Sequence, residues 1–254
     1  MGRLTILNLN QSFPREDGSR LQVLEDFSLE VQDKEFVCIL GSSGCGKTTL
    51  LRLIAGLDTA ESGSIILDGE EMKGTNPKVG MVFQEYSLFP WRTVIDNIAF
   101  GLEMQGINKE ERYHIAERYL NLVNLTQFRN SYPSELSGGM RQRVAVARAL
   151  AVDPVLLLMD EPFGALDAQT RNMLQTELLT IWEKTKKTVV FITHSVDEAV
   201  FLADRIIVLT PRPGRICETI PLSLPRPRDR TSVEFAQLRR HVLDLINQPK
   251  CTLQ

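Results

Sequence analysis

The sequence lacks any hydrophobic run long enough to cross a bilayer. Hydrophobic residues make up 43% of its 254 residues. They occur in short segments, well below the ~18–20 consecutive apolar residues that a membrane-spanning helix needs. The N-terminal residues also lack the apolar core of a secretory signal. We therefore expect a chain that does not span a membrane and is not secreted.

Cysteine and excess positive charge are also scarce. Cys38, Cys45, Cys217 and Cys251 contain no C-x-x-C pair, so the sequence offers no zinc-binding pattern. Such scattered cysteines favour free thiols in a reducing cytosol. The net charge of −3 leaves no basic excess to neutralise nucleic-acid phosphates, so we expect no nucleic-acid partner.

One glycine-rich segment carries the strongest signal in the sequence. Residues 41–48 fit the phosphate-loop pattern G-x-x-x-x-G-K-[ST]. The apolar run at 36–40 predicts a strand before the loop, and residues 49–55 predict a helix after it. Glycines let the loop turn its N–H groups inward, and the helix N-terminus favours an anion. Lys47 is expected to reach the β- and γ-phosphates, and the Thr48 hydroxyl to bind Mg²⁺.

Apolar runs alternate with helical patterns along most of the chain. A parallel sheet covered on both faces produces this alternation. From about residue 93 to 150 the helical period dominates, which predicts a helical lobe inserted at about 87–150. Residues 211–230 are rich in proline and arginine and are predicted to form a loose connection before a last amphipathic helix. The predicted strands lie at 3–9, 23–31, 36–40, 64–69, 79–83, 155–159, 189–192 and 206–209, and helices at 139–151, 168–186 and 196–203.

Two acidic residues end the apolar strand at 155–159. Asp160 at the end of a buried strand is suited to hold Mg²⁺, usually through water. Glu161 would then lie beside the γ-phosphate, where it polarises an attacking water. The alternative is an ordinary solvated acidic turn.

A second anion site is predicted at Ser137, Gly138 and Gly139. This segment opens a helix and exposes backbone N–H groups there. The alternative is a simple helix cap, because serine is common at that position. A cap does not require two glycines, which are poor helix formers.

Three other side chains are candidates because of their positions beside strands. Gln84 follows the strand at 79–83 and is suited to bind Mg²⁺ or orient water. His194 follows the strand at 189–192 and is suited to bond a γ-phosphate oxygen. Phe13 offers a ring for stacking on a purine, although an isolated Phe is more often core. The cluster of Leu88, Phe89 and Trp91 fits either an interface or the lobe core.

These motifs, in this order, resemble the nucleotide-binding subunit of an ATP-binding cassette (ABC) transporter. The resemblance implies an α/β fold of the P-loop NTPase type. That fold has a mainly parallel central sheet, an antiparallel β subdomain and the inserted helical lobe. The signature departs from the family pattern at Met140, where glutamine is usual. The resemblance implies these roles: Phe13, adenine stacking; Gly41–Thr49 (Gly41, Ser42, Ser43, Gly44, Cys45, Gly46, Lys47, Thr48, Thr49), Walker A; Gln84, Q-loop; Leu136–Gln142, signature; Asp160, Walker B; Glu161, catalytic base; 165–167, D-loop; His194, switch histidine.

The resemblance also implies partners and location. Residues 1–215 would form the ATPase domain and residues 216–254 a tail. Two subunits, identical or homologous, would sandwich two molecules of ATP with Mg²⁺, each held by Walker A and the opposite signature. They would drive a membrane permease from its cytoplasmic face, as peripheral subunits, and act indirectly with an extracytoplasmic solute-binding protein. A soluble ABC ATPase without a transport role is the alternative.

A finer resemblance concerns the cargo. Residues 89–97, 160–168 and 224–230 together resemble the nitrate/sulfonate/taurine importer branch. The implied cargo is a small oxyanion or sulfonate. This inference is one of association, since nothing in the chain is expected to bind cargo.

Overall fold

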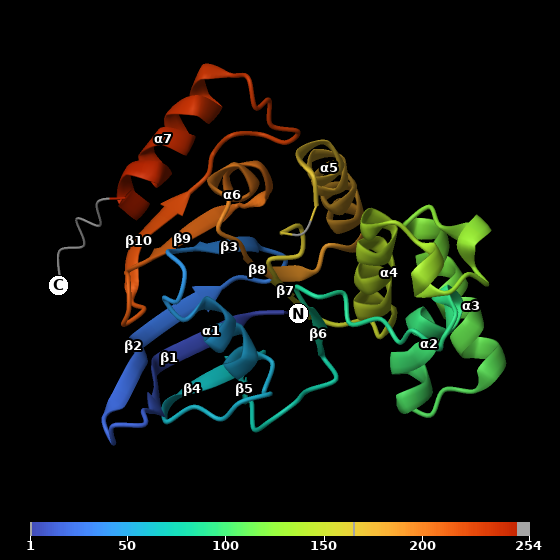
Figure 1. Cartoon of the computed structure of the whole chain (residues 1–254), viewed down its shortest axis with the longest axis horizontal. Coiled ribbons are helices and arrows are strands. Elements are labelled where there is room, and N and C mark those ends of the chain that lie inside the picture. Colours follow the sequence, from blue (N-terminus) through green and yellow to red (C-terminus); the bar gives the residue numbers. More distant parts are fainter. Residues whose placement is uncertain (1, 165, 248–254) are drawn as a thin grey trace. The chain divides into compact units, whose positions relative to one another are not determined.

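The computed structural model describes residues 2–164 and 166–247, which fall into two compact units (Figure 1). Of the described residues, the first unit combines 2–76 with 188–247, and the second comprises 77–164 and 166–187. The domain boundary predicted at residue 215 stays a prediction.

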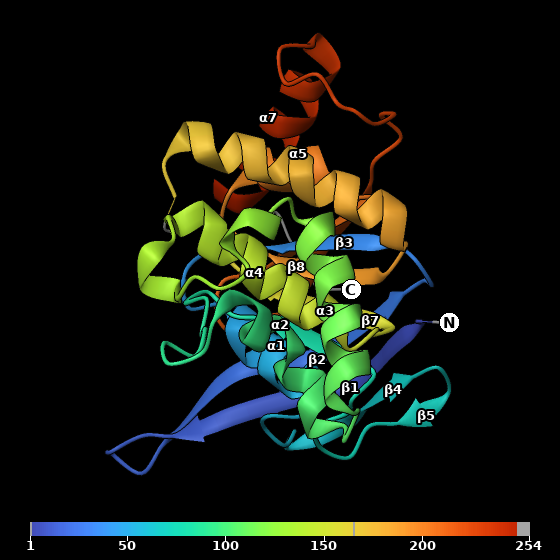
Figure 2. The same ribbon diagram turned by 90° about the vertical axis from the view of Figure 1, so that its right-hand side faces the viewer.

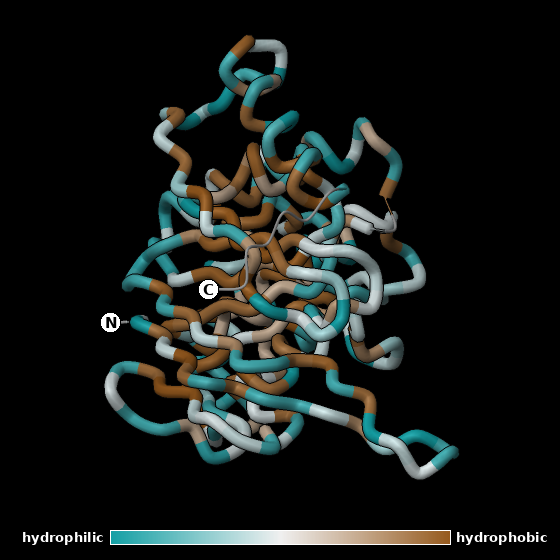
Figure 3. Tube along the Cα trace, turned by 90° about the vertical axis from the view of Figure 1, so that its left-hand side faces the viewer, coloured by the Kyte–Doolittle hydropathy of each residue, from teal (hydrophilic) through white to brown (hydrophobic). Residues whose placement is uncertain are grey.

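The first unit contains a four-stranded antiparallel sheet. Its strand order is β2-β1-β4-β5, and leucine, isoleucine and phenylalanine side chains fill its buried face, among them Leu4, Ile6 and Phe27. The turn between β1 and β2 protrudes and is hydrophilic (Figures 2 and 3). The predicted antiparallel β subdomain is confirmed. Its strands are β1 (Leu4–Pro14), β2 (Arg20–Val31), β4 (Ser62–Leu67) and β5 (Glu70–Glu71).

The first unit also contains parallel strands. β3 (Phe36–Leu40) pairs in parallel with both β8 (Thr188–Ile192) and β9 (Arg205–Leu209). Every residue of β3 and β8 is buried, because helices cover both faces. In Figure 1, α1 and α6 lie on opposite sides of these strands. The helices of this unit are α1 (Lys47–Ile54), α6 (Val196–Leu202) and α7 (Val233–Asn247).

One strand contradicts the sequence prediction. β10 (Ile216–Pro221) pairs antiparallel with β9, so the expectation of a loose connection at 211–230 is wrong there. Ile220 is the one buried residue of this edge strand. An edge strand with one buried side chain has no apolar alternation to reveal it, and its terminal proline is typical of an edge.

The second unit combines a parallel strand pair with the predicted helical lobe. β6 (Val79–Val82) pairs with β7 (Leu156–Asp160). The lobe helices pack against one another around buried residues such as Ile98, Leu120 and Val144, which confirms the inserted lobe (Figure 2). The helices are α2 (Val94–Met104), α3 (Lys109–Leu122), α4 (Gly138–Ala151) and α5 (Ala168–Thr185), with short 3-10 turns at Thr126–Phe128 and Pro133–Glu135.

No helix within residues 2–164 and 166–247 combines the length and the hydrophobicity that crossing a bilayer requires.

The cysteines differ in their oxidation state. Cys38 and Cys45 are free and buried, but Cys217 is disulfide-bonded, so the expectation of free thiols is wrong for Cys217. Sequence spacing does not reveal which cysteines a fold brings within bonding distance. Cys251 lies outside the described residues.

Candidate functional site

The phosphate loop lies between β3 and α1, which confirms the predicted strand–loop–helix arrangement. Gly44 and Gly46 have φ angles of 77° and 102°, a region that L side chains rarely adopt. A Cβ atom on Gly46 would lie 2.9 Å from Cγ1 of Val23. Only glycine therefore fits at position 46, both for its backbone and for its space.

Lys47 is the first residue of α1 and is almost completely buried. Its Nζ donates hydrogen bonds to the carbonyl oxygens of Gly41 at 2.9 Å and Ser42 at 3.1 Å. The ammonium group thus lies inside the curve of the loop, where inward N–H groups would receive an anion. The neighbouring Thr48 is exposed in the first turn of the helix, and Thr49 is partly exposed.

Cys45 occupies the fifth position of the phosphate loop, and its side chain packs inside the loop. Its side chain is fully buried, and burial raises the pKa of its thiol. A Cβ atom on Gly41 would lie 2.7 Å from Cys45 Sγ, so the sulfur fills the space beside Gly41. The protonated thiol is a packing group here, because only the thiolate is a good nucleophile.

A second loop, at residues 211–214, forms hydrogen bonds with the phosphate loop and with β2. Arg212 Nε donates a hydrogen bond to the Gly44 carbonyl oxygen at 2.9 Å. Nearby, the Gly214 N–H donates to the Val23 carbonyl oxygen at 2.8 Å. The sequence analysis missed Arg212, because it assigned residues 211–230 to a loose connection. The Pro-Arg-Pro-Gly turn at 211–214 was the available signal.

His194 and the phosphate loop follow two adjacent parallel strands. β3 leads into the loop, and its neighbour β8 leads into His194. The Thr193 N–H donates to the Ile39 carbonyl oxygen at 3.3 Å, which ties the two strand ends together. Ligands of open α/β sheets bind at the carboxyl ends of strands. His194 is exposed there.

Phe13 lies near the end of β1, paired with Leu21 of β2. Its side chain is exposed at 40%, so the core alternative for Phe13 is wrong. The next residues of β2 include Val23 and Leu24, which contact Gly46 of the phosphate loop. The ring is accessible on a hairpin that touches the loop.

In the second unit, Asp160 and Glu161 have different environments. Asp160 ends β7 and is 5% exposed, whereas Glu161 is partly exposed. Glu161 has a φ angle of 42°, a left-handed conformation that costs a non-glycine residue ~1–3 kcal/mol. Such strain clusters at functional sites. The burial of Asp160 argues against an ordinary solvated turn.

Gln84 and Glu161 both approach Gly164. Both residues follow the carboxyl ends of β6 and β7, whose register pairs Val82 with Met159. A Cβ atom on Gly164 would lie 3.9 Å from Gln84 Nε2 and 4.0 Å from Glu161 Oε2. The Gln84 carboxamide and the Glu161 carboxylate thus both lie near Gly164. A carboxylate and an amide close to one position are suited to orient and activate a water molecule there.

The signature segment begins α4. The Ser137 Oγ accepts a hydrogen bond from the Met140 N–H at 3.3 Å, so the capping alternative is present in the structure. Both glycines also meet close neighbours: a Cβ on Gly138 would lie 3.1 Å from Leu166 Cδ2, and one on Gly139 would lie 3.2 Å from Thr170 Cγ2. Packing therefore accounts for the glycines independently of any anion. Ser137 remains exposed.

The D-loop segment leads into α5. The Asp167 carboxylate accepts hydrogen bonds from the N–H groups of Gln169 and Thr170 at 3.1 and 3.0 Å, and these bonds lower the pKa of Asp167. Leu166 is buried. Ala165 lies outside the described residues.

The segment after Gln84 is held by a residue that the sequence analysis missed. Arg148 of α4 donates hydrogen bonds to the carbonyl oxygens of Ser87 at 2.7 Å and Tyr86 at 3.0 Å. Phe89 packs against Phe100 with ring centroids 4.5 Å apart. Trp91, in contrast, is 72% exposed. Phe89 is partly buried, and its ring also lies 5.6 Å from the Trp91 ring. The core alternative is therefore wrong for Trp91 and holds only in part for Phe89.

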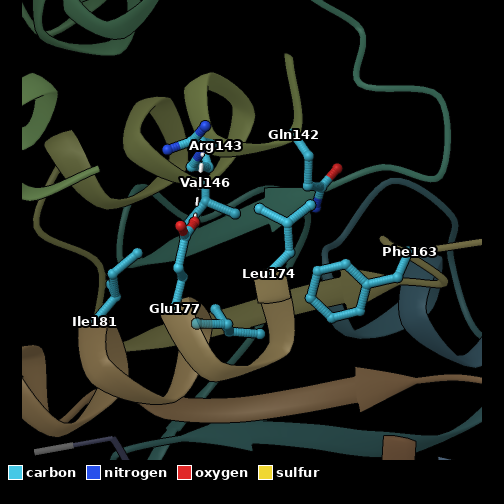
Figure 4. A pocket seen from close by; sticks show the side chains of 8 residues that line it. Gln142, Arg143, Val146, Phe163, Leu174, Glu177 and Ile181 are labelled. Carbon is cyan, nitrogen blue, oxygen red and sulfur yellow. Dashed lines mark ion pairs between the residues drawn. The ribbon is translucent and has the colours of Figure 1, made fainter. Parts of the chain in front are cut away.

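A small cavity of about 10 Å³ lies between α4 and α5. Figure 4 shows Gln142 on α4 with its carboxamide directed toward this cavity, near Leu174 and Phe163. Gln142 is 1% exposed, and neither its Oε1 nor its Nε2 has a hydrogen-bond partner within the described part of the chain. Buried amides are usually bonded.

The predicted metal ligands have the right chemistry for Mg²⁺. Thr48 offers a hydroxyl, Gln84 a carboxamide oxygen and Asp160 a carboxylate, and hard oxygen donors are what Mg²⁺ prefers. Thr48 belongs to the first unit and the other two to the second.

Residues 24–164 match the ABC transporter family. The chain belongs to this family. It is an ATP-binding subunit, and its activity is ATP hydrolysis coupled to transmembrane transport. The predicted family and fold class are thereby confirmed.

Relatives at high identity cover almost all of this ATP-binding subunit. An uncharacterized ABC transporter ATP-binding protein of Methanocaldococcus jannaschii is 56% identical over 96% of this chain and 91% of its own. The nitrate import ATP-binding protein NrtD of Synechocystis is 50% identical, covering 90% and 87%. The aliphatic sulfonates import ATP-binding protein SsuB of Bacillus cereus is 45% identical, covering 94% of both.

A solved structure shares the fold. It is the dimeric post-hydrolysis state of the ATP-binding cassette MJ0796, bound to ADP and Pi. The similarity has a TM-score of 0.76 at 31% identity and covers 87% of this chain and 100% of that one.

Proposed function

We propose that this chain powers an importer for a small anion of the nitrate, sulfonate or taurine class. The observation that carries the ATPase part is that the Gln84 carboxamide and the Glu161 carboxylate both approach Gly164, where Glu161 has a positive φ angle. The cargo class is supported by relatives named for nitrate and aliphatic sulfonate import. It is also supported by the three sequence segments that resemble that branch.

The phosphate loop of the first unit would bind the nucleotide. Residues 41–49 would cradle the phosphates with their N–H groups, and Lys47 would exchange the carbonyl oxygens of Gly41 and Ser42 for the β- and γ-phosphate oxygens. A charge-assisted bond to phosphate is stronger than one to a neutral carbonyl. Phe13 would stack on the adenine.

Residues of both units would supply the groups for hydrolysis. Thr48, Gln84 and Asp160 would hold Mg²⁺, which neutralises charge on the phosphates when it is bound. Glu161 would accept a proton from the attacking water. His194, from the first unit, would donate a hydrogen bond to a γ-phosphate oxygen.

A second subunit would complete the site. Ser137, Gly138 and Gly139 would contact the ATP held by a facing subunit, identical or homologous, in a head-to-tail dimer. The exposure of Ser137 at the start of α4 fits this role. The similar cassette of known structure is itself a dimer with ADP and Pi.

The membrane partner would dock on the second unit near Trp91. That partner would be an integral-membrane permease, with a solute-binding protein acting on its other side and this subunit peripheral at the cytoplasmic face. An exposed tryptophan suits an interface anchor. A soluble ABC ATPase without a permease is the alternative.

The test is ATP hydrolysis by the subunit co-purified with the permease encoded beside it and reconstituted with the cognate solute-binding protein. We expect nitrate, ethanesulfonate or taurine to stimulate hydrolysis, and a neutral sugar to leave it unchanged. A Lys47→Ala complex serves as the inactive control. Failure of all three anions to stimulate an assembled, active complex contradicts the cargo class, and failure to assemble favours the soluble alternative.

A further inference from the structure

Arginine residues after β10 bind the end of α6. The segment Leu224–Arg230 alternates proline with arginine, and its arginines approach the carbonyl end of that helix. Arg228 Nη1 donates hydrogen bonds to the carbonyl oxygens of Val200 at 2.7 Å and Phe201 at 3.4 Å. Arg226 Nη2 donates to the Leu202 carbonyl oxygen. We call Arg226, Arg228 and Arg230 the arginine clamp.

The clamp completes the hydrogen bonding of a helix that cannot do so itself. The last four carbonyl groups of any α-helix lack partners within the helix. In α6 the Ala199 carbonyl oxygen accepts from the Ala203 N–H at 3.0 Å, and guanidinium groups satisfy the remaining three. α6 has only seven residues, too few for a helix to be stable alone. Its stability therefore depends on tertiary contacts: the packing of its buried side chains against β3 and α7, and the hydrogen bonds from the arginines to its last carbonyl groups.

Burial and charge strengthen the clamp. Arg228 is 6% exposed, and its Nε also donates to the Leu224 carbonyl oxygen at 3.1 Å. Burial lowers the pKa of Arg228 to about 10, so the guanidinium stays charged at neutral pH. The Arg230 guanidinium stacks 3.9 Å from the centroid of the Phe201 ring. Cations at a helix C-terminus also interact favourably with the helix dipole.

The opposite end of α6 holds the turn that contains His194. The Ser195 Oγ caps the helix by accepting from the Glu198 N–H at 3.4 Å. The Thr193 hydroxyl donates to the buried Glu198 carboxylate and accepts from the Ser195 N–H at 3.0 Å. His194 thus lies between two residues that are both hydrogen-bonded to the first turn of α6.

We propose that the arginine clamp positions His194 for catalysis by fixing α6, the short helix that joins them. The inference rests on the proposed contact of His194 with the γ-phosphate. The arginines are positioning residues, since they act through the helix and the turn at 193–195. Removing Arg228 leaves two carbonyl oxygens without their donor, and an α6 that shifts or frays carries the turn with it.

The test is a double-mutant cycle between Arg228→Met and His194→Ala in the full chain. The rate of ATP hydrolysis is measured in single turnovers with subunit in excess, well below the unfolding midpoint of each variant. We expect Arg228→Met to lower the rate constant about tenfold while the subunit concentration for half-maximal rate changes about twofold or less. In the His194→Ala background, Arg228→Met should lower the rate no further.

Two further variants make the result specific. Arg239→Gln is the matched control, because Arg239 pairs with Asp197 of α6 at 3.0 Å on the exposed side of the same helix and donates to none of its carbonyls. It should hydrolyse ATP at the wild-type rate. Arg228→Lys keeps the charge and one donor group and should recover part of the rate. It replaces Arg228→Met in the cycle if that variant fails to fold.

Each other outcome has a definite meaning. A wild-type rate for Arg228→Met, or an equal further loss in the His194→Ala background, overturns the positioning role of the clamp. A wild-type rate for His194→Ala instead overturns the proposed role of the histidine. The two failures are therefore distinguishable in one set of measurements.

Discussion

Gln84 Nε2 and Glu161 Oε2 lie 3.9 and 4.0 Å from the position that a Cβ atom on Gly164 would occupy. The two side chains come from segments far apart in the chain, at the ends of paired strands β6 and β7. Because Glu161 has a positive φ angle, its side chain leaves the strand in a direction that an extended residue would not give. This geometry is the basis of the first prediction.

Glu161→Gln should bind ATP but hydrolyse it at least ~10²-fold more slowly, the lower end of the loss expected for a general base. The amide keeps the size of the side chain but does not accept a proton. The variant should accumulate as an ATP-bound dimer, detectable by size-exclusion chromatography with ATP. Near-normal turnover would remove Glu161 from the role of base.

Ser137→Arg should abolish ATP-driven dimerisation and turnover while leaving ATP binding to the monomer intact, since the phosphate loop belongs to the other unit. Ser137→Ala separates the capping role, because loss of an N-cap costs ~1 kcal/mol of stability. Nucleotide affinity of the monomer is measured by calorimetry, with Lys47→Ala as the reference for lost binding. If Ser137→Arg loses monomer affinity as far as Lys47→Ala does, the facing-subunit arrangement is wrong.

Arg212→Ala should weaken ATP binding about three- to tenfold, as expected for one charge-assisted hydrogen bond near the surface. The Arg212 guanidinium fixes the Gly44 carbonyl oxygen, so its loss leaves the phosphate loop less ordered before nucleotide binds. Arg215→Ala is the control, because Arg215 pairs with Glu25 at 2.7 Å rather than with the loop. Equal ATP affinity of the Arg212→Ala variant and the wild type, measured by calorimetry, would show that the contact does not order the loop.

Local patterns predicted the elements that position the site. The apolar run at 36–40, the glycines after it and the strand ending in Asp160 each carry their signal within a few residues, and the structure has the corresponding elements. Edge strand β10 was missed because one buried residue makes no pattern. The sequence did not decide whether Trp91 is exposed, because a large apolar side chain occurs both in protein cores and at interfaces.

The arginine clamp shows a different limit of sequence reasoning. In the sequence, its residues indicated only a resemblance to one importer branch and no structural role. The atoms that they bind are the backbone carbonyl oxygens of Val200, Phe201 and Leu202. Any residue has such a carbonyl, so the sequence of the target gives no signal. The contacts of Arg148 were missed for the same reason, because its acceptors are the backbone carbonyls of Tyr86 and Ser87.

Gln142→Leu should raise the free energy of unfolding by ~1 kcal/mol. It removes a buried amide that has no hydrogen-bond partner among the described residues, and it places an apolar side chain of similar size beside an apolar cavity. The unfolding midpoint should rise by about 2–4 °C for a chain of this size. Thermal unfolding of the isolated subunit measures it. Gln175→Leu in α5 is the control, since the equally buried Gln175 has a hydrogen-bonding or electrostatic partner and should lose stability. A destabilised Gln142→Leu would show that the amide is satisfied in solution.

Trp91→Ala should leave the stability of the subunit and its basal ATPase activity unchanged but abolish coupling to the permease. The side chain is 72% exposed, so its truncation forms no cavity, whereas a buried aromatic would cost ~3–5 kcal/mol. Aromatic side chains anchor interfaces, and the backbone that joins Gln84 to Trp91 is fixed by Arg148. A shift at Gln84 would therefore be transmitted to the surface that Trp91 marks.

Phe89→Ala is the matched comparison for Trp91→Ala, because Phe89 is partly buried and packs against Phe100 of the lobe. It should lower the unfolding midpoint, while Trp91→Ala should not. Both variants are then assayed for binding to the permease and for ATP hydrolysis stimulated by the transported anion. A Trp91→Ala subunit that unfolds at the wild-type midpoint and still couples normally would place the docking surface elsewhere on the chain. A clear fall in its midpoint would instead mean that the indole stabilises the lobe despite its exposure.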